Sequence, residues 1–338
     1  MKQRRLGKTG LTVSEICLGT MTFGSMADES TSHAILDRAL DQGVDFLDTA
    51  EIYPVPPMDD YAGRSEEIVG RWLAGKRRDK VIIATKVAGP SGGWFQTPVR
   101  AGKGTLDRHH IERAVEGSLK RLGIDYIDLY QTHWPDPEYP IEDTLRGLEN
   151  VVLSGKVRYV GCSNETAYGL TRALMFSKFE ALPRHETIQN NFSVLNRRFE
   201  DELKAVCRAE SVSLLPYSPL AGGVLSGKYQ DGKWPDGARF SLYRMGGRRG
   251  ETMTSRFVND KTLATTARLA KIASDCEMPL TTFAVAWTLS RDFVGSSIIG
   301  VTKVEQLDEL LNASGVKLPE SALTAVDAVT RDILYPMG

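Results

Sequence analysis

The 338-residue sequence predicts an α/β fold: a (β/α)8 barrel of the TIM-barrel type, with an N-terminal β-hairpin and additional C-terminal helices. Short apolar runs typical of buried parallel strands alternate along the chain with amphipathic helical segments. Eight such strands can be counted, and neither a second block of strands nor a linker divides them. Residues 1–338 are therefore expected to form one domain. A doubly wound open sheet is the alternative.

The first expected element is the hairpin, in which 3–6 and 12–14 flank the glycine-bounded turn Gly7 to Gly10. The eight barrel strands are then expected at 16–20, 44–48, 81–86, 126–133, 156–161, 187–189, 212–217 and 297–299. The strand at 81–86 is continuously apolar or β-branched until Lys86, so it is expected to be buried on both faces.

The helices are placed by capping residues, apolar stripes and terminal glycines. They are expected from a Ser30-Thr31 cap to Gly43, from Ser65 to Gly75, from an Asp107 cap to Leu122, and at 141–153, 166–178, 199–209, 260–276, 280–290, 303–313 and 319–334. Two long loops remain, at 87–106 and 219–258, and loops of such length are usually functional or disordered.

Composition excludes several classes of function. The net charge of −1 gives no basic field for nucleic acid. No apolar run approaches the roughly 18 residues of a membrane span, and the N-terminus lacks the apolar core of a signal peptide. The four widely spaced cysteines, Cys17, Cys162, Cys207 and Cys276, indicate free buried thiols. A cytoplasmic protein is therefore expected.

Four polar residues lie at, or just past, the C-terminal ends of expected strands: Asp48, Tyr53, Lys86 and His133. In a (β/α)8 barrel this is the face where catalysis takes place. Lys86 could lower the pKa of Tyr53 while Asp48 holds the ammonium, and a fall of two pKa units would be worth about 2.7 kcal/mol. His133 could polarise a carbonyl oxygen that Tyr53 protonates.

Each of these residues also has an ordinary structural interpretation. Asp48 could be a hydrogen-bonding group at a strand end, and Tyr53 a half-buried tyrosine. Lys86 could belong to a structural ion pair, and His133, beside Trp134, could be a satisfied core histidine. Their joint position on one face of the barrel favours the catalytic interpretation.

The sequence lacks the common metal-binding and nucleotide-binding motifs. No HExxH motif occurs and no HxH follows a strand, so no metal site is expected. The sequence contains neither GxGxxG nor GxxxxGK[ST]. Barrels can instead hold phosphate with their last loops and a nearby helix N-terminus. Gly300-Val-Thr-Lys303, with Thr302 as N-cap, and the glycine loop Leu220–Lys228 offer such a site.

The sequence resembles the aldo-keto reductases over nearly its whole length. The motifs that carry the resemblance are Leu18-Gly-Thr20, Asp45-Phe-Leu-Asp-Thr-Ala-Glu-Ile-Tyr53, Ala84-Thr-Lys86, Ser118-Leu-Lys-Arg-Leu-Gly123, Asp128-Leu-Tyr-Gln-Thr-His-Trp134, Gly155-Lys-Val-Arg-Tyr-Val-Gly-Cys-Ser-Asn164, Ile188-Gln189 and Pro216-Tyr-Ser-Pro-Leu220. Tyr53-Pro-Val-Pro-Pro57 and Ser163-Asn-Glu-Thr-Ala167 look like the bacterial Tas-like subgroup, which is related to the potassium-channel β subunits.

The resemblance implies an NADP(H)-dependent oxidoreductase whose catalytic tetrad is Asp48, Tyr53, Lys86 and His133, with Tyr53 as general acid. It implies that Ser163, Asn164 and Gln189 hold the nicotinamide carboxamide and that Tyr217 stacks on the ring. Together with the phosphate-site residues, the expected cofactor contacts are Gly19, Thr20, Met21, Asp48, Ser163, Asn164, Gln189, Tyr217, Ser218, Leu220, Gly222, Lys228, Gly300, Thr302, Lys303, Gln306 and Glu309.

One stretch departs from the family pattern. Many members have arginine or lysine directly after strand eight and again in the following helix, to bind the adenosine 2′-phosphate. Lys303 alone is the candidate cation here, and Gln306 follows it. NADPH is therefore the expected cofactor, with NADH as a possible second one.

The expected substrate is a small-molecule carbonyl compound, an aldehyde or a ketone. Trp94, Phe95 and Trp134, with Tyr53 and His133, are the expected pocket residues, and Met21 is a further candidate wall. Loop aromatics could equally pack on the barrel rim. Two alternatives stay open: a cofactor-sensing regulatory protein of the channel β-subunit type, and an alcohol or sugar dehydrogenase using the same residues. The oligomeric state is left open.

Overall fold

The computed structural model describes residues 1–75, 78–91 and 96–337. Its core is a sheet of eight strands, each parallel to its neighbours. In sheet order these are β10 (Ser297–Ile299), β3 (Ile16–Gly19), β4 (Phe46–Asp48), β5 (Ile82–Val87), β6 (Ile127–Thr132), β7 (Val157–Ser163), β8 (His185–Gln189) and β9 (Ser213–Leu214). Parallel bridges from Leu214 to Val294 and from Tyr217 to Ile298 join the last strand to the first. The predicted (β/α)8 barrel is confirmed.

The antiparallel hairpin of β1 (Gln3–Arg5) and β2 (Thr12–Ser14) precedes the barrel, as predicted. Its apolar side chains Leu6, Leu11 and Val13 share a buried cluster with inward-facing residues of the strands, among them Phe46 and Leu129. Successive strand side chains point to opposite faces, so residues two positions further along face the same interior. The hairpin side of the barrel interior is therefore apolar, and polar residues begin one layer above it.

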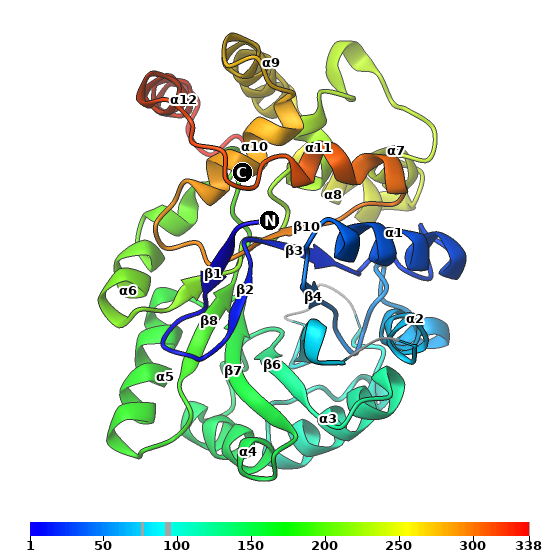
Figure 1. The fold of residues 1–338 in the computed structure, drawn as a ribbon, viewed down its shortest axis with the longest axis vertical. Coiled ribbons are helices and arrows are strands. Elements are labelled where there is room, and N and C mark those ends of the chain that lie inside the picture. The colour runs from blue at the N-terminus through cyan, green and yellow to red at the C-terminus, as the bar shows by residue number, and fades with distance from the viewer. Residues whose placement is uncertain (76–77, 92–95, 338) are drawn as a thin grey trace.

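Helices surround the sheet (Figure 1). Those that follow the barrel strands are α1 (Glu29–Asp41), α2 (Arg64–Leu73), α3 (Arg108–Leu122), α4 (Ile141–Leu153), α5 (Ala167–Phe179), α6 (Leu203–Glu210), α10 (Leu280–Leu289) and α11 (Leu307–Leu311). The additional helices are α7 (Arg239–Arg244), α8 (Gly247–Phe257), α9 (Asp260–Asp275) and α12 (Glu320–Asp332). α9 and α12 contact each other and lie outside the ring at the top of Figure 1.

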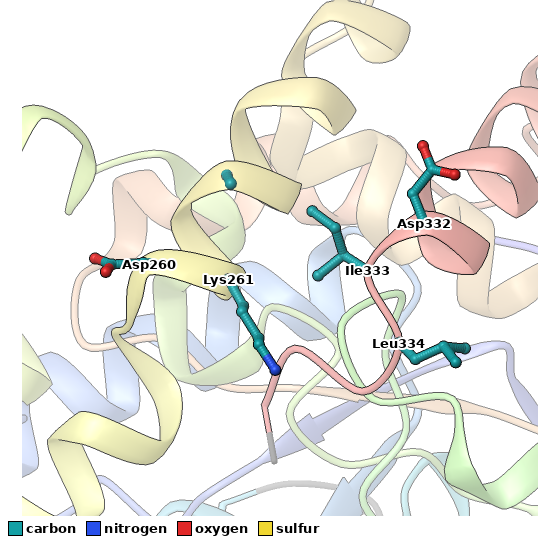
Figure 2. Close-up of a pocket in the computed structure, with 6 residues that line it drawn as sticks. Asp260, Lys261, Asp332, Ile333 and Leu334 are labelled. Carbon is teal, nitrogen blue, oxygen red and sulfur yellow. The ribbon is translucent and has the colours of Figure 1, made fainter.

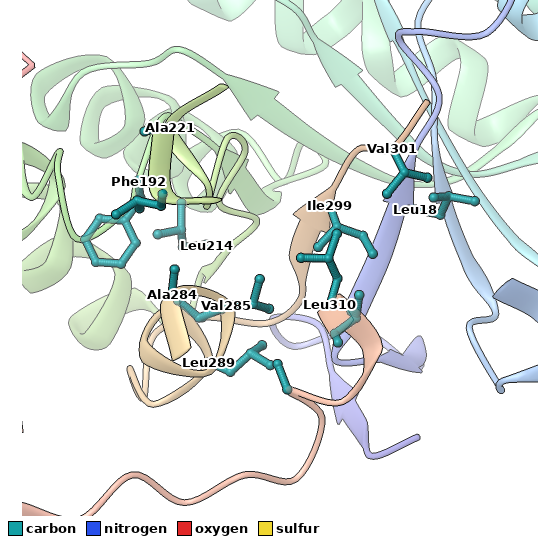
Figure 3. Close-up of a cluster of buried hydrophobic side chains, with 14 of the residues drawn as sticks. Leu18, Phe192, Leu214, Ala221, Ala284, Val285, Leu289, Ile299, Val301 and Leu310 are labelled. Carbon is teal, nitrogen blue, oxygen red and sulfur yellow. The ribbon is translucent and has the colours of Figure 1, made fainter. Parts of the chain in front are cut away.

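The largest apolar cluster fills the space between the sheet and these helices. Figure 3 shows part of it, where Leu214 and Ile299 from the sheet face Val285 of α10 and Leu310 of α11. α10 is buried from Thr282 to Leu289, in keeping with its largely apolar sequence. This packing fixes the last strands, which carry the candidate cofactor loops.

Several predicted boundaries need correction. The N-cap of α1 is Asp28, whose carboxylate accepts from the Thr31 N–H, and not Ser30-Thr31. The long loop 219–258 contains α7 and α8. Thr302 does not cap the helix after strand eight, because Lys303 holds the N-cap position and the Gln306 side chain accepts from the Thr302 N–H at 2.9 Å.

Other predictions are confirmed. Asp107 caps α3 by accepting from the His110 N–H, and Gly123 ends that helix in the left-handed conformation. All four cysteines are free, although Cys276 is only half-buried. None of the helices in the described part of the chain is long and apolar enough to cross a membrane.

Candidate active site

Four polar side chains meet at the C-terminal ends of three neighbouring strands. Asp48 is the last residue of β4, Lys86 lies one residue before the end of β5, and His133 directly follows β6. Tyr53 belongs to the short segment that leaves β4. Phe46 and Asp48, like Ala84 and Lys86, are two residues apart, so the polar pair lies directly above the apolar barrel layer.

Lys86 and Asp48 form a fully buried ion pair. Lys86 Nζ donates to Asp48 Oδ2 at 2.6 Å and to the Thr49 carbonyl oxygen at 2.8 Å. Burial alone would lower the pKa of Lys86, but the charge of Asp48 and the proximity of Tyr53 outweigh it and raise the pKa above its ordinary value. Lys86 is therefore a fixed cation.

Tyr53 lies beside that cation, with Lys86 Nζ 4.9 Å from the centre of its ring. Burial is the largest influence and raises the pKa of Tyr53, while the charge of Lys86 lowers it, and the net result lies above the ordinary value of 10. The expectation that Lys86 brings this pKa below normal is thus wrong for the protein alone. The lysine acts in the predicted direction, but burial is stronger, so Tyr53 stays protonated at neutral pH.

His133 completes the group. Its ring lies edge-on to Tyr53, 5.7 Å between ring centroids, and stacks on Trp134 at 3.9 Å with an interplanar angle of 8°. Burial, followed by the charge of Lys86, lowers the pKa of His133 well below 6.5, so the imidazole is neutral. A protonated phenol and a neutral imidazole therefore lie side by side, an arrangement that can donate hydrogen bonds to one oxygen atom.

A chain of amides links the tetrad to the neighbouring strands. Gln189 Nε2 donates to Asp48 Oδ1 at 2.8 Å, and Asn164 Nδ2 donates to the His133 carbonyl oxygen at 2.9 Å. The Tyr217 hydroxyl donates to Asn164 Oδ1 at 2.8 Å. Of the expected carboxamide ligands, Gln189 and Asn164 thus already contact the tetrad, and Ser163 joins them by donating to the Gln189 carbonyl oxygen at 2.7 Å.

The expected cofactor residues of the first βα loop also adjoin the tetrad. Thr20 donates through both its N–H and its hydroxyl to the Asp48 carbonyl oxygen. A Cβ on Gly19 would come within 2.8 Å of Ile298, so the two strands approach closely there. Met21 packs against the cluster of buried residues that contains Tyr53.

The glycine loop lies after Tyr217 and includes the 3-10 helix η5 (Ala221–Ser226). Gly222 and Gly223 have φ values of +64° and +98°, which side-chain-bearing residues rarely adopt. The Lys228 ammonium lies next to Gly223 of this loop, and burial and the charge of Arg239 lower the pKa of Lys228. Ser218 and Leu220 begin the loop, and the Ser218 carbonyl oxygen accepts from the Ala221 N–H.

The second candidate phosphate segment, 300–303, is more open than the glycine loop. Space is open around Gly300, and Lys303 is exposed. Thr302 and Gln306 hydrogen-bond to each other, whereas the Glu309 carboxylate accepts from the Thr281 hydroxyl of α10 at 2.6 Å. Trp94 and Phe95, expected as pocket walls, lie outside the described residues.

The comparisons with known proteins agree with this arrangement. The model of the aldo/keto reductase family matches residues 15–331, nearly the whole chain. The chain belongs to the aldo/keto reductase family. It is therefore an oxidoreductase of that family by descent, and the predicted family resemblance is confirmed.

Three relatives that match over nearly their whole length show which members of this family the chain is similar to. The chain is 39% identical to "Protein tas" of Escherichia coli over 99% of both chains. It is 35% identical to "Uncharacterized oxidoreductase YrpG" of Bacillus subtilis, over 97% of this chain and 96% of that one. It is also 35% identical to "Probable voltage-gated potassium channel subunit beta" of Oryza sativa, over 94% and 92% of the two chains.

Three residues that act on the tetrad or on Tyr217 in this aldo/keto reductase were not predicted. Gln131 Nε2 lies 3.4 Å from Asp48 Oδ1, and its position two residues before His133 was a usable signal. Burial raises the pKa of Tyr53, and the charge of Arg239, like that of Lys86, acts against it; burial raises the pKa of Tyr217 to about 12, and the charge of Arg256 acts against it. Both arginines lie on α7 and α8, which were expected as loop.

Two open hollows lie beside the C-terminal tail, apart from the tetrad. The first, of about 450 Å³, is bordered by Lys261 of α9 and by Asp332, Ile333 and Leu334 (Figure 2). The second, of about 660 Å³, continues towards α8 and Met337. Neither includes a tetrad residue. No group of three or more His, Cys, Asp or Glu side chains in the described residues could hold a metal ion.

Proposed function

We propose that this aldo/keto reductase reduces an aldehyde or ketone to the alcohol with NADPH, and that Tyr53 is the general acid. The observation that supports this most strongly is the buried ammonium of Lys86, 2.6 Å from Asp48 and 4.9 Å from the Tyr53 ring. A buried cation beside a tyrosine stabilises negative charge that develops on the phenol oxygen as its proton leaves.

Tyr53 and His133 would divide the work at the carbonyl oxygen. Neutral His133 would donate a hydrogen bond that orients and polarises the carbonyl group, and Trp134 would hold the imidazole plane by stacking. Tyr53, protonated at neutral pH, would then deliver its proton as charge builds up on that oxygen. Lys86 would balance the resulting phenolate, and Asp48 would keep Lys86 in place.

The residues around the tetrad fit a dinucleotide cofactor. When bound, NADPH would supply the hydride. Gln189 uses its NH2 group on Asp48 and keeps its side-chain oxygen as an acceptor for a ligand amide. The left-handed glycines beside Lys228 form a loop whose backbone a phosphate can approach closely. The exposed Lys303 would bind the 2′-phosphate, and its single charge keeps NADH as a possible second cofactor.

The pocket wall would include Met21 and Trp134, which pack against the buried Tyr53 cluster. Trp94 and Phe95 remain predictions for the same wall. We further propose that residues 1–338 act as one domain, because the hairpin shares an apolar cluster with the barrel strands.

The test is a fluorescence titration with NADPH and with NADH, followed by a panel of aldehydes and ketones. We expect tighter binding of NADPH than of NADH, and NADPH oxidation with at least one panel member. Failure of both nucleotides to bind would contradict the proposal at the cofactor. Tight binding without turnover on a broad panel would contradict the reductase assignment and favour a cofactor-sensing role.

A further inference from the structure

A second buried ion pair lies next to the tetrad and belongs to neither the tetrad nor the expected cofactor residues. Arg100 Nη1 donates to Glu51 Oε2, and Arg100 Nη2 donates to Glu51 Oε1, both at 2.8 Å. The two side chains are only 9% and 3% exposed. This two-bond geometry is the strongest that an arginine and a carboxylate can form. Glu51 lies two residues before Tyr53, whereas Arg100 lies in the loop between β5 and α3.

Both partners also bind the backbone of one residue, Ala88, which directly follows β5. The Ala88 N–H donates to Glu51 Oε1 at 2.6 Å, and Arg100 Nη2 donates to the Ala88 carbonyl oxygen at 2.8 Å. Ala88 is two residues from Lys86. The ion pair therefore joins three segments: the one that carries Tyr53, the end of the strand that carries Lys86, and the β5–α3 loop.

The loop conformation at this anchor is not one that its residues favour. Arg100 and Ala101 have φ values of +53° and +52°, in the left-handed region. Residues with a side chain rarely adopt this conformation, so contacts must hold it in place. The C-terminal end of the loop is held separately: Asp136 Oδ2 accepts hydrogen bonds from the Thr105 hydroxyl and the Leu106 N–H.

The residue before Arg100 contributes to the surroundings of Tyr53. Val99 packs against the buried cluster formed by Ala50, Ile52, Tyr53 and Ala88, and Trp134 packs against the same cluster. The position of Arg100 therefore sets the position of an apolar side chain that packs against the cluster containing the proposed general acid.

We propose that the Glu51–Arg100 pair positions the substrate wall and thereby determines which carbonyl compounds reach Tyr53. Arg100 is a positioning residue: it contacts neither the tetrad side chains nor the reacting atoms, and acts through Val99 and Ala88. The inference rests on the proposed reductase function for its kinetic readout. A pair that served stability alone would leave the relative use of small and bulky substrates unchanged.

The test compares Arg100→Met and Arg100→Lys with wild type. For each protein, kcat and KM are measured with NADPH and two aldehydes, a short linear one and a fused-ring aromatic one. We expect Arg100→Met to change the ratio of the two kcat/KM values by about tenfold or more, mainly through KM. NADPH affinity should stay within about twofold, and Arg100→Lys should recover part of the ratio.

Arg78→Met is the matched control. Arg78 pairs with the buried Asp128 at 2.6 Å, at the N-terminal ends of β5 and β6, whereas the Glu51–Arg100 pair lies past the C-terminal ends of β4 and β5. This variant should lower thermal stability while leaving the substrate ratio as in wild type. An equal change of the ratio in the Arg78 and Arg100 variants, or no change in either, would overturn the positioning role.

Binding separates this inference from the proposed function. Dissociation constants of the same two aldehydes are measured by calorimetry on the proteins loaded with NADP+, which has no hydride to transfer. If wild type shows no turnover, the reductase proposal fails, and the ratio of these constants still decides the positioning role. The positioning role is supported if Arg100→Met changes the ratio of the two dissociation constants and Arg78→Met leaves it as in wild type. If Arg100→Met also leaves this ratio unchanged, the positioning role is overturned.

Discussion

Lys86 is the side chain on which the geometry of the candidate site depends most. It has no exposed surface, and it lies between the carboxylate of Asp48 and the ring of Tyr53. The lysine at the end of an apolar strand is visible in the sequence, and so is its need for a partner. The net pKa of Tyr53 was not predictable, because the depth of burial that raises it follows from packing across the whole barrel mouth.

Replacement of Lys86 by methionine should destabilise the fold. The change leaves Asp48 as a buried anion without its cation, which typically costs about 3–5 kcal/mol. The double variant Asp48→Asn/Lys86→Met removes both charges and should recover much of that loss. Urea denaturation of the two variants and wild type measures the effect. A single variant as stable as wild type would contradict the electrostatic account.

His185 should make the protein sensitive to acid. Burial and the charge of Arg184 lower its pKa from 6.5 to about 4. Below pH 6.5 His185 binds a proton in the unfolded chain, whereas in the folded protein it stays neutral until about pH 4. The free energy of unfolding therefore falls between pH 6.5 and about pH 4 and does not depend on this group above pH 6.5. At 1.36 kcal/mol per pKa unit the loss is about 3 kcal/mol.

The measurement is the free energy of unfolding of His185→Gln at pH 7 and at pH 4. The difference between the two values should be about 3 kcal/mol smaller than in wild type. His109→Gln, at an exposed position of α3, is the control and should keep the wild-type difference. An unchanged difference in His185→Gln would show that this imidazole does not titrate as described.

Lys303→Met should weaken NADPH binding by about tenfold, equivalent to 1.4 kcal/mol, while leaving NADH binding unchanged. The reason is that only NADPH carries the 2′-phosphate that this exposed ammonium is proposed to contact. Lys317→Met, at another exposed position, is the control. Fluorescence titration measures both nucleotides, and an equal loss for NADPH and NADH would contradict the 2′-phosphate assignment.

At the scale of elements, caps and strand ends were predictable where one residue decides the outcome. Asp107 caps the start of α3 and Gly123 ends it, as predicted. The helices α7 and α8 were missed because 239–257 is rich in glycine and arginine, which is more typical of a loop. Tertiary contacts support them instead: Phe240 and Phe257 stack on each other at 4.9 Å between ring centroids.

Asn259 joins several of these elements. It caps α9 through a reciprocal pair of bonds with Thr262, and its Nδ2 donates to the Pro336 carbonyl oxygen of the C-terminal tail. Asn259→Ala should therefore cost about 1–2 kcal/mol. Asn259→Asp keeps the cap acceptor but loses the donor, so it should cost less. Thermal unfolding ranks the variants, and an Asp variant less stable than the Ala variant would contradict the cap assignment.

At the scale of the whole molecule, the count of eight strands was enough to predict the barrel. The regular alternation of strand and helix leaves few topologies, and the tetrad positions follow from strand ends alone. The Glu51–Arg100 pair was not predictable, because its partners lie 49 residues apart and meet only through a loop with left-handed residues. The cytoplasmic location stays a prediction.

The most direct test of the central claim is a comparison of Tyr53→Phe with wild type. NADPH affinity is measured by fluorescence, and NADPH oxidation is followed with an aldehyde that wild type reduces. We expect unchanged NADPH affinity and a fall in kcat of about 10²–10⁴-fold, because the variant keeps the ring and loses only the proton donor. Normal turnover by Tyr53→Phe with intact NADPH binding would contradict Tyr53 as the general acid.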